Sequence, residues 1–338
     1  MPYRAAVSSP QPETNPQDPL GLLCRPVARR FSVVGYLGST SVAHIYRAIH
    51  QIMERPCFLK ITPSEKEVPD SLRREAAAAG KTNHAAVLRL YDAGCKDGYA
   101  YLAQEWSEGP SLRTIMNQGA DVSVPDLLGL GLQLLDALCA LHSAGLCLRA
   151  FDPERILVPT VNGRFSLRLF DLSRIANQGE QLARESASES KAATGFKVRS
   201  TRYMAPEEIQ DKAAEPRSDL YSFGVLLCEM ITGEYPYATK GKGPMAYVVS
   251  HLKDEVRPLA FTGKPELPGD LPGIVRRLLA KDPADRFESA EACRRALEDL
   301  IVPDMVRLNV PGRRQNLEAW RTRVKHGIRE TRPPFGLE

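Results

Sequence analysis

The hydrophobic pattern of the first third of the chain is typical of β-strands. Short apolar runs rich in β-branched and aromatic residues alternate with polar turns. A turn-like stretch, Gly38–Ser41, separates the first two runs and predicts an antiparallel meander. A segment rich in Ala, Glu and Arg at 71–82 predicts one helix. The predicted strands cover 31–34, 43–46, 57–61, 87–91 and 99–105.

Helical periodicity replaces this pattern after a break at 108–110. Apolar residues then recur at the spacing of amphipathic helices. The predicted helices cover 125–143, 217–232, 245–253, 271–280 and 289–301. A small β-rich lobe followed by a larger helical lobe predicts an α+β, bilobal fold with a cleft between the lobes.

The composition divides the chain into segments. Residues 1–25 are rich in Pro, Gln, Asn and Ser, which is typical of a flexible leader rather than a signal peptide. A polar stretch at 177–199 predicts a mobile loop, and one short helix is predicted at 317–325. The predicted parts are a flexible leader at 1–30, a domain at 31–302 with an N-lobe at 31–107 and a C-lobe at 108–302, and a basic tail at 303–338.

Charge and cysteine usage narrow the function classes. The net charge is +4 over 338 residues, with Lys and Arg dispersed outside the tail, so no nucleic-acid partner is expected. The seven cysteines include no C-x-x-C pair, so we expect neither a metal site nor a redox site. The most apolar stretch, 127–148, contains Gln133, Asp136 and His142, which favours a buried helix over a transmembrane segment. These features predict a cytoplasmic protein.

Short motifs follow one another in a fixed order. They are Gly38-Ser-Thr-Ser-Val-Ala-His-Ile45, Cys57-Phe-Leu-Lys60, Leu148-Arg-Ala-Phe-Asp-Pro-Glu-Arg155, Asp171-Leu-Ser173 and Ala205-Pro-Glu207. In this order they resemble the motifs of protein kinases, and of bacterial Ser/Thr kinases in particular. The resemblance covers about residues 31–302 and implies the bilobal kinase fold.

The resemblance implies a nucleotide site that has degenerated. Lys60 stands at the position that pairs the phosphates, and Glu75 at the position of its partner on the small-lobe helix. The family has a small residue where this chain has Phe58, whose ring, facing Ile45 and Leu157, is expected to fill the adenine slot. The implied nucleotide-binding residues are Gly38, Ile45, Lys60, Glu75, Glu105, Leu157 and Asp171.

The catalytic loop departs most from the family. Ala150 stands at the position of the catalytic aspartate, and Arg155 at the position of the Mg²⁺-binding asparagine. A general base contributes roughly 10²–10⁴-fold in rate, so transfer by the usual route is not expected. Asp152 is either a surrogate base or the partner of Arg155 in a structural clasp at i, i+3. Arg155 is alternatively a neutraliser of phosphate charge, and Asp171 still offers one carboxylate to Mg²⁺.

Other residues match positions that maintain the family's fold. Glu207 and Arg286 match a buried ion pair of the large lobe, and Asp219 matches the aspartate that braces the catalytic loop. Arg149 matches an arginine that clamps a phosphorylated activation loop. The local candidates for phosphorylation are Ser186, Ser188, Ser190, Thr194, Ser200 and Thr201.

Three functional hypotheses follow from the resemblance. The first is a pseudokinase, a signalling scaffold or allosteric regulator that binds a protein such as an active kinase, with ATP and Mg²⁺ binding weak or absent. The second is an unconventional Ser/Thr kinase or ATP-binding transferase that uses Lys60, Asp171 and Asp152. The third is a nucleotide sensor without chemistry, in which occupancy changes the affinity for a partner.

Overall fold

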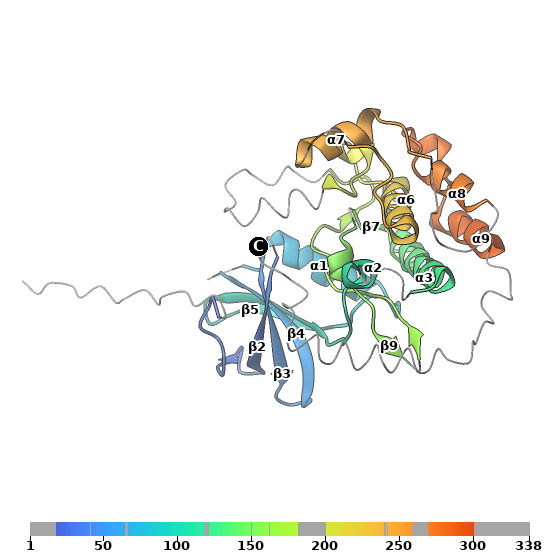
Figure 1. Ribbon diagram of the computed structural model, residues 1–338. Coiled ribbons are helices and arrows are strands. Elements are labelled where there is room, and N and C mark those ends of the chain that lie inside the picture. The colour runs from blue at the N-terminus through green and yellow to red at the C-terminus, as the bar shows by residue number, and fades with distance from the viewer. Residues whose placement is uncertain are drawn as a thin grey trace, which may run out of the picture.

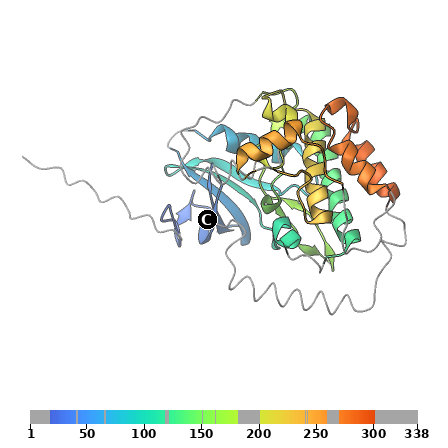
Figure 2. The same ribbon diagram turned by 45° about the horizontal axis from the view of Figure 1, so that its top comes forward.

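The fold consists of a β-rich N-lobe and a helical C-lobe, as predicted (Figure 1). The turned view separates the blue strands from the yellow-to-red helices in the same way (Figure 2). The structure is a computed structural model. It describes residues 18–40, 42–64, 67–117, 122–149, 151–161, 163–181, 201–239, 241, 243–258 and 270–300. The predicted tail and its helix, and most of the predicted mobile loop, lie outside these residues.

The N-lobe sheet is antiparallel and has the strand order β1-β2-β3-β4-β6-β5. Its strands are β1 (Pro26–Val27), β2 (Phe31–Ser39), β3 (His44–His50), β4 (Arg55–Pro63), β5 (Leu90–Lys96) and β6 (Tyr99–Glu105). Helix α1 (Asp70–Lys81) lies against β5 and β6. Lys60 on β4 pairs with Ile45 on one side and Leu102 on the other, so the register fixes the lysine at the centre of the sheet.

Two predictions for the N-lobe were wrong. The strand predicted at 87–91 begins only at Leu90, and Val87 instead forms an isolated bridge to Leu169 of the C-lobe. Residues 18–30, assigned to the flexible leader, are ordered because Leu22 and Val27 are buried against the sheet. Asp18 anchors this segment by accepting hydrogen bonds from two backbone amides and from a tyrosine hydroxyl on β3, those of Leu22, Leu23 and Tyr46.

The C-lobe is built on two long helices, α3 and α6, which lie side by side (Figure 1). Its α-helices are α2 (Leu112–Asn117), α3 (Val124–Ser143), α5 (Pro206–Ile209), α6 (Pro216–Thr232), α7 (Pro244–Lys253), α8 (Leu271–Leu278) and α9 (Ala290–Leu300). The 3₁₀ helices are η2 (Pro153–Arg155) and η3 (Pro283–Asp285). Short antiparallel pairs join β7 (Leu146–Cys147) to β12 (Ala176–Asn177), β8 (Ile156–Leu157) to β11 (Arg168–Leu169), and β9 (Thr160–Val161) to β10 (Arg164–Phe165).

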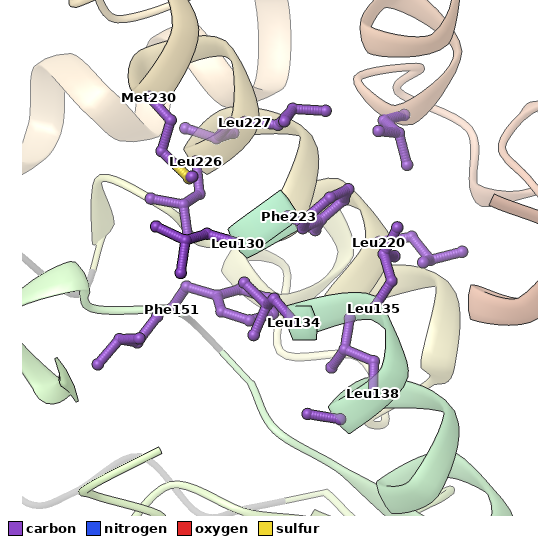
Figure 3. Close-up of a cluster of buried hydrophobic side chains, with 14 of the residues drawn as sticks. Leu130, Leu134, Leu135, Leu138, Phe151, Leu220, Phe223, Leu226, Leu227 and Met230 are labelled. Atoms are coloured by element: carbon purple, nitrogen blue, oxygen red, sulfur yellow. The ribbon is translucent and has the colours of Figure 1, made fainter. Parts of the chain in front are cut away.

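Helix α3 is the core helix that the sequence predicts. Ser123 accepts a hydrogen bond from the amide of Asp126 and so caps its start. Within the described part of the chain, α3 alone has the length and hydropathy of a membrane span. Its leucines are nevertheless buried against α6, whose Leu220, Phe223 and Leu227 point toward them (Figure 3). Burial in this core accounts for its apolar composition.

The connection between the lobes passes close to the C-lobe backbone. Gly109 has a φ of 142°, and a Cβ atom at this position would lie 2.7 Å from the backbone nitrogen of Pro159. Only glycine fits such a contact without displacing the chain. The turn therefore holds the start of the C-lobe against the segment that follows the catalytic loop.

Candidate functional site

The predicted contact between Lys60 and Glu75 is confirmed. The Lys60 Nζ lies 2.5 Å from the Glu75 Oε1, and both side chains are buried. Glu75 also accepts hydrogen bonds from the backbone amide of Leu172 at 3.2 Å and from the Nε2 of Gln104 at 3.3 Å. Burial raises the pKa of Glu75, while Lys60 opposes that rise. This carboxylate therefore links α1 to β6 and to the C-lobe.

Asp171 is held by two cationic side chains at once. Its Oδ1 lies 3.4 Å from the Lys60 Nζ and accepts the amide of Ser173 at 2.9 Å. Its Oδ2 pairs with the guanidinium of Arg155. Burial opposes ionisation of Asp171, but Arg155 and Lys60 outweigh it and hold the pKa of the carboxyl below its ordinary value. Both oxygens of the predicted metal ligand thus have partners within the chain.

Arg155 also forms the predicted clasp with Asp152. The Arg155 Nε lies 3.4 Å from the Asp152 Oδ2. A second oxygen of Asp152 accepts the amide of Glu154 at 3.0 Å and starts the 3₁₀ turn η2. The sequence did not predict that Arg155 would contact Asp171 as well. Ala150, at the position of the catalytic aspartate, lies outside the described residues.

The space beside these residues is small. A cavity of about 30 Å³ is lined by Asp152, Arg155, Asp171 and neighbouring catalytic-loop residues. That volume has room for only about two or three water molecules. Among the described residues, no three carboxylate, histidine or cysteine side chains come together as a metal-binding group.

Phe58 fills the region where the resemblance places adenine. It is buried in one apolar cluster with Ile45, Leu157 and Phe170, as predicted for the first two. Its ring centroid lies 4.4 Å from that of Trp106 and 4.5 Å from that of Phe170. Aromatic pairs at these separations attract each other beyond simple burial. The slot between the lobes is therefore packed by side chains from both.

The rim of this slot carries the remaining predicted nucleotide-site residues. Gly38 has a φ of 139° near the end of β2, opposite Ile45. The guanidinium of Arg47 lies over Trp106, 4.9 Å from the ring centroid. The backbone amide of Glu105 donates to the carbonyl of Arg89 at 2.8 Å. The backbone amide of Glu105 is thus already paired within the N-lobe.

The residues that were predicted to maintain the fold support the catalytic loop. Asp219 on α6 accepts the backbone amides of Leu148 and Arg149, each at 2.8 Å, and its Oδ2 lies 2.8 Å from the His142 Nε2. The side chain of Arg149 donates its Nε to Glu208 at 3.0 Å, inside the protein. This guanidinium is therefore paired with a carboxylate of the chain. Of the candidate phosphorylation sites, all but Thr201 lie outside the described residues.

The predicted pair of Glu207 and Arg286 is confirmed as a two-pronged buried ion pair. Two guanidinium nitrogens donate to the two carboxylate oxygens at 2.7 and 2.9 Å. Ser218 donates a further hydrogen bond to Glu207 at 2.6 Å. Burial opposes ionisation of Glu207, but the hydrogen bonds from Arg286 outweigh it and lower the pKa of the carboxyl.

Sequence reasoning missed another buried carboxylate in the C-lobe, that of Glu229. Glu229 on α6 pairs with Arg113 from α2 at 3.0 Å and with Arg202, which precedes α5, at 2.7 Å. The hydroxyl of Tyr203 also donates to it. Because these residues are scattered along the chain, no local spacing pattern could have joined them.

Comparison with known sequences agrees with this geometry. The family model described as protein kinase domain matches residues 31–297. The chain belongs to the protein kinase family. The Ser/Thr-protein kinase PknL of Mycobacterium tuberculosis (strain ATCC 25618 / H37Rv) is 30% identical over 284 residues, which are 81% of this chain and 67% of that protein. The Ser/Thr-protein kinase PrkC of Bacillus subtilis (strain 168) is 25% identical over 274 residues, 80% of this chain but only 40% of that protein.

Proposed function

We propose that this protein is a pseudokinase, a member of the kinase family that has lost phosphoryl transfer and acts through protein binding. The observation that carries the proposal is the pair between Arg155 and Asp171. The guanidinium of Arg155 is permanently charged and is part of the chain. It contacts the Asp171 carboxylate, which in the family faces the metal. The charge of Asp171 is thereby neutralised without Mg²⁺.

Protein kinases in general bind ATP with Mg²⁺, and the residues of this cleft do not fit that group. Asp171 is shared between Lys60 and Arg155, and the cavity beside it measures about 30 Å³. Ligand pockets usually enclose about 300–1,000 Å³. The adenine slot is packed by Phe58 against Trp106. We therefore derive no reaction step through Mg²⁺ or ATP.

The catalytic loop supports the same proposal. Ala150 has no group that can accept the proton of a substrate hydroxyl. Loss of a positioned base costs roughly 10²–10⁴-fold in rate, and active kinases turn over only about 1–100 times per second. The retained Lys60–Glu75 pair then serves to fix α1 against the sheet rather than to orient phosphates.

A protein-binding role suits a cleft that is filled by its own side chains. The contacts of Lys60, Glu75 and Asp171 join the two lobes through groups of the chain itself, which favours one arrangement of the outer surfaces. A fixed surface lowers the entropic cost of association. We propose a cytoplasmic signalling scaffold or allosteric regulator whose partner is an active kinase or another signalling protein.

A second candidate is an unconventional Ser/Thr kinase or ATP-binding transferase. The intact assembly of Lys60, Glu75 and Asp171 favours it, because these groups still converge. It requires Asp152 to act as the base. Against that role, Asp152 is already paired with Arg155 and accepts the amide of Glu154.

A radiolabelled phosphotransfer assay on the full chain tests the proposal. With millimolar Mg·ATP and a generic basic protein substrate, we expect the wild type to incorporate no more label than Asp171→Ala. Incorporation by the wild type above that background would overturn the proposal. If Asp152→Ala also abolished such incorporation, Asp152 would be the surrogate base of the second candidate.

A further inference from the structure

Helix α7 carries an apolar stripe on its outer side, at the end of the C-lobe away from the N-lobe sheet (Figure 1). Met245 and Val249, four residues apart, keep 71% and 44% of their surface exposed. Leu252 continues the stripe one turn further and is half-buried. The other side of the helix packs inward through Ser250 and His251, which are buried. Since amphipathic helices usually turn their apolar side to the core, the outer stripe is open to another segment.

The stripe leads into a cavity at the C-terminal end of α7. The cavity measures about 250 Å³ and is lined by Leu252 with residues of α5 and of the segment entering η3, among them Pro206 and Pro283. Its volume is below the range of about 300–1,000 Å³ that is usual for small-molecule sites. The cavity therefore suits one inserted side chain better than a separate small ligand.

One exposed carboxylate in the cavity wall makes no ion pair with a described residue. It belongs to Asp282. The other charged residues of the wall are Glu207, Lys281 and Lys212. Glu207 is paired with Arg286, Lys281 donates to a backbone carbonyl of α7 at 3.0 Å, and Lys212 is exposed. A cationic side chain that reached Asp282 would therefore find a carboxylate without a competing cation.

The chain itself contains a segment with matching chemistry. Residues 301–338 follow α9, beyond the part that matches the kinase family model. The helix predicted at 317–325 has an apolar stripe with the spacing i, i+3 and i+7. Two cations, four residues apart, flank this stripe. The apolar residues are Leu317, Trp320 and Val324, and the cations are Arg321 and Lys325.

This segment can reach α7. The cavity wall at Asp282 belongs to the stretch just before α9, and α9 is about 16 Å long. The connecting residues 301–316 span up to ~50 Å when extended. That reach is about the diameter of a globular domain of this size.

The size of the surface favours a tethered occupant over a separate protein. Stable complexes bury about 800 Å² on each partner, which is much more than three side chains and one small cavity offer. A segment tethered to the same chain is held at an effective concentration of about 1 mM. A contact too weak to hold a separate protein is then sufficient.

We propose that residues 317–325 dock on the C-lobe of their own chain, with their apolar stripe against that of α7. Trp320 occupies the cavity, and Arg321 or Lys325 pairs with Asp282. The docked segment covers the exposed apolar residues of α7, so a protein partner reaches them only by displacing it. The proposal goes beyond the pseudokinase role and does not depend on loss of catalysis.

Acrylamide quenching of Trp320 fluorescence in the full chain tests the proposal. The chain has two tryptophans, and the Trp320→Phe protein gives the signal of Trp106, which is subtracted. A free peptide of residues 314–328 is the reference for the undocked segment. The quenching constant of Trp320 in the full chain should be at least about twofold smaller than in the peptide, since tethering keeps half of the segment or more docked.

A matched pair of valine substitutions locates the docking surface. Val249→Lys should raise the quenching constant to the peptide value, because it places a charge on the apolar stripe and repels the cations of the segment. Val161→Lys makes the same change on β9, at a valine that is 50% exposed, and should leave the constant unchanged. Met245→Lys tests the same stripe if Val249→Lys fails to fold.

Asp282→Asn tests the polar contact. The asparagine oxygen can still accept the amide of Ala284, so η3 keeps its cap. The docking equilibrium should fall by about two- to fivefold, the effect of losing an exposed ion pair. Asp285→Asn, on the same 3₁₀ helix but outside the cavity wall, should leave it unchanged. Equal effects of the two substitutions would contradict the pairing with Asp282.

Three results would overturn the docking itself. They are a quenching constant of Trp320 equal to that of the peptide, equal effects of Val249→Lys and Val161→Lys, and protection of Trp320 that grows with protein concentration. The last would show that the segment binds a second copy of the chain. The phosphotransfer assay measures a different property, so failure of either proposal is recognisable by itself.

Discussion

Buried carboxylates have different kinds of partner in the C-lobe and in the cleft between the lobes. In the C-lobe, Glu207 and Arg286 keep the pairing that the kinase resemblance implies, with a hydrogen bond on each carboxylate oxygen. In the cleft, Asp171 keeps its position but its partner is the side chain of Arg155. The first arrangement maintains the fold, and in the proposed pseudokinase the second takes the place of a metal ion. Fold and chemistry are therefore separable in this protein.

The C-lobe pair should give the largest loss of stability. Arg286→Ala leaves Glu207 buried without its cation, which typically costs about 3–5 kcal/mol. Urea unfolding followed by circular dichroism measures this loss. Arg295→Ala removes a largely exposed arginine from the surface of α9 and should cost less than about 1 kcal/mol. Equal costs for the two variants would contradict the structural role of the pair.

Removal of the Phe58 ring should lower the stability of the protein and open the adenine slot. Phe58→Ala is expected to lower the free energy of unfolding by about 3 kcal/mol. It should also let millimolar adenosine raise the melting temperature, which the wild type should not show. Phe223→Ala, a comparable deletion in the C-lobe core, is the control and should be destabilised without responding to adenosine. An adenosine response in the wild type would argue against the filled slot.

A buried histidine should make the C-lobe sensitive to acid. The His251 Nε2 contacts the carbonyl of Arg202 at 3.0 Å, so this nitrogen carries the proton and the Nδ1 accepts from Tyr221. Burial lowers the pKa of His251 to about 4 from 6.5. The unfolded chain therefore binds a proton that the folded chain does not, and stability falls as pH drops below 6.5.

The size of this effect follows from the pKa difference. Between pH 6.5 and 5 the histidine should remove about 2 kcal/mol of stability. Urea titrations at both pH values should show a loss smaller by that amount in His251→Asn than in the wild type. Parallel pH profiles for the two proteins would show that the imidazole is not held neutral.

Loss of the ion pair between Asp152 and Arg155 should have the smallest effect on stability. Asp152→Asn removes the charge that faces Arg155 but keeps an oxygen that can accept the Glu154 amide. Because Arg155 retains Asp171, the expected cost is about 1 kcal/mol or less. Thermal unfolding measures it. A loss above about 3 kcal/mol would mean that Asp152, and not Asp171, is the main partner of the arginine.

The sequence predicted those parts of the site whose partners recur at known motif positions. The contacts Lys60–Glu75 and Glu207–Arg286 were both expected, and both are present. The two lobes and the main helices also follow the hydrophobic periodicity, with boundaries that differ by a few residues. These features depend on local pattern or on the order of motifs, which a single sequence contains.

The missed features depend on long-range packing. Residues 18–30 look like a polar leader, yet Leu22 and Val27 find an apolar surface on the sheet. Arg155 was expected to contact Asp152, three residues away, whereas its contact with Asp171 requires the catalytic loop and the following strand to be brought together. Spacing alone does not specify this contact, but the resemblance places both residues at Mg²⁺-binding positions, and that signal could have predicted it.

The most direct test of the central claim is the melting temperature of the wild type in an ATP series, with and without Mg²⁺. A ligand at about 100 times its dissociation constant adds roughly 2.7 kcal/mol of stability. We predict no Mg²⁺-dependent rise for the wild type and a rise for the double variant Phe58→Ala, Arg155→Asn. A clear Mg²⁺-dependent rise in the wild type would contradict the account, because it would show that Asp171 exchanges Arg155 for metal.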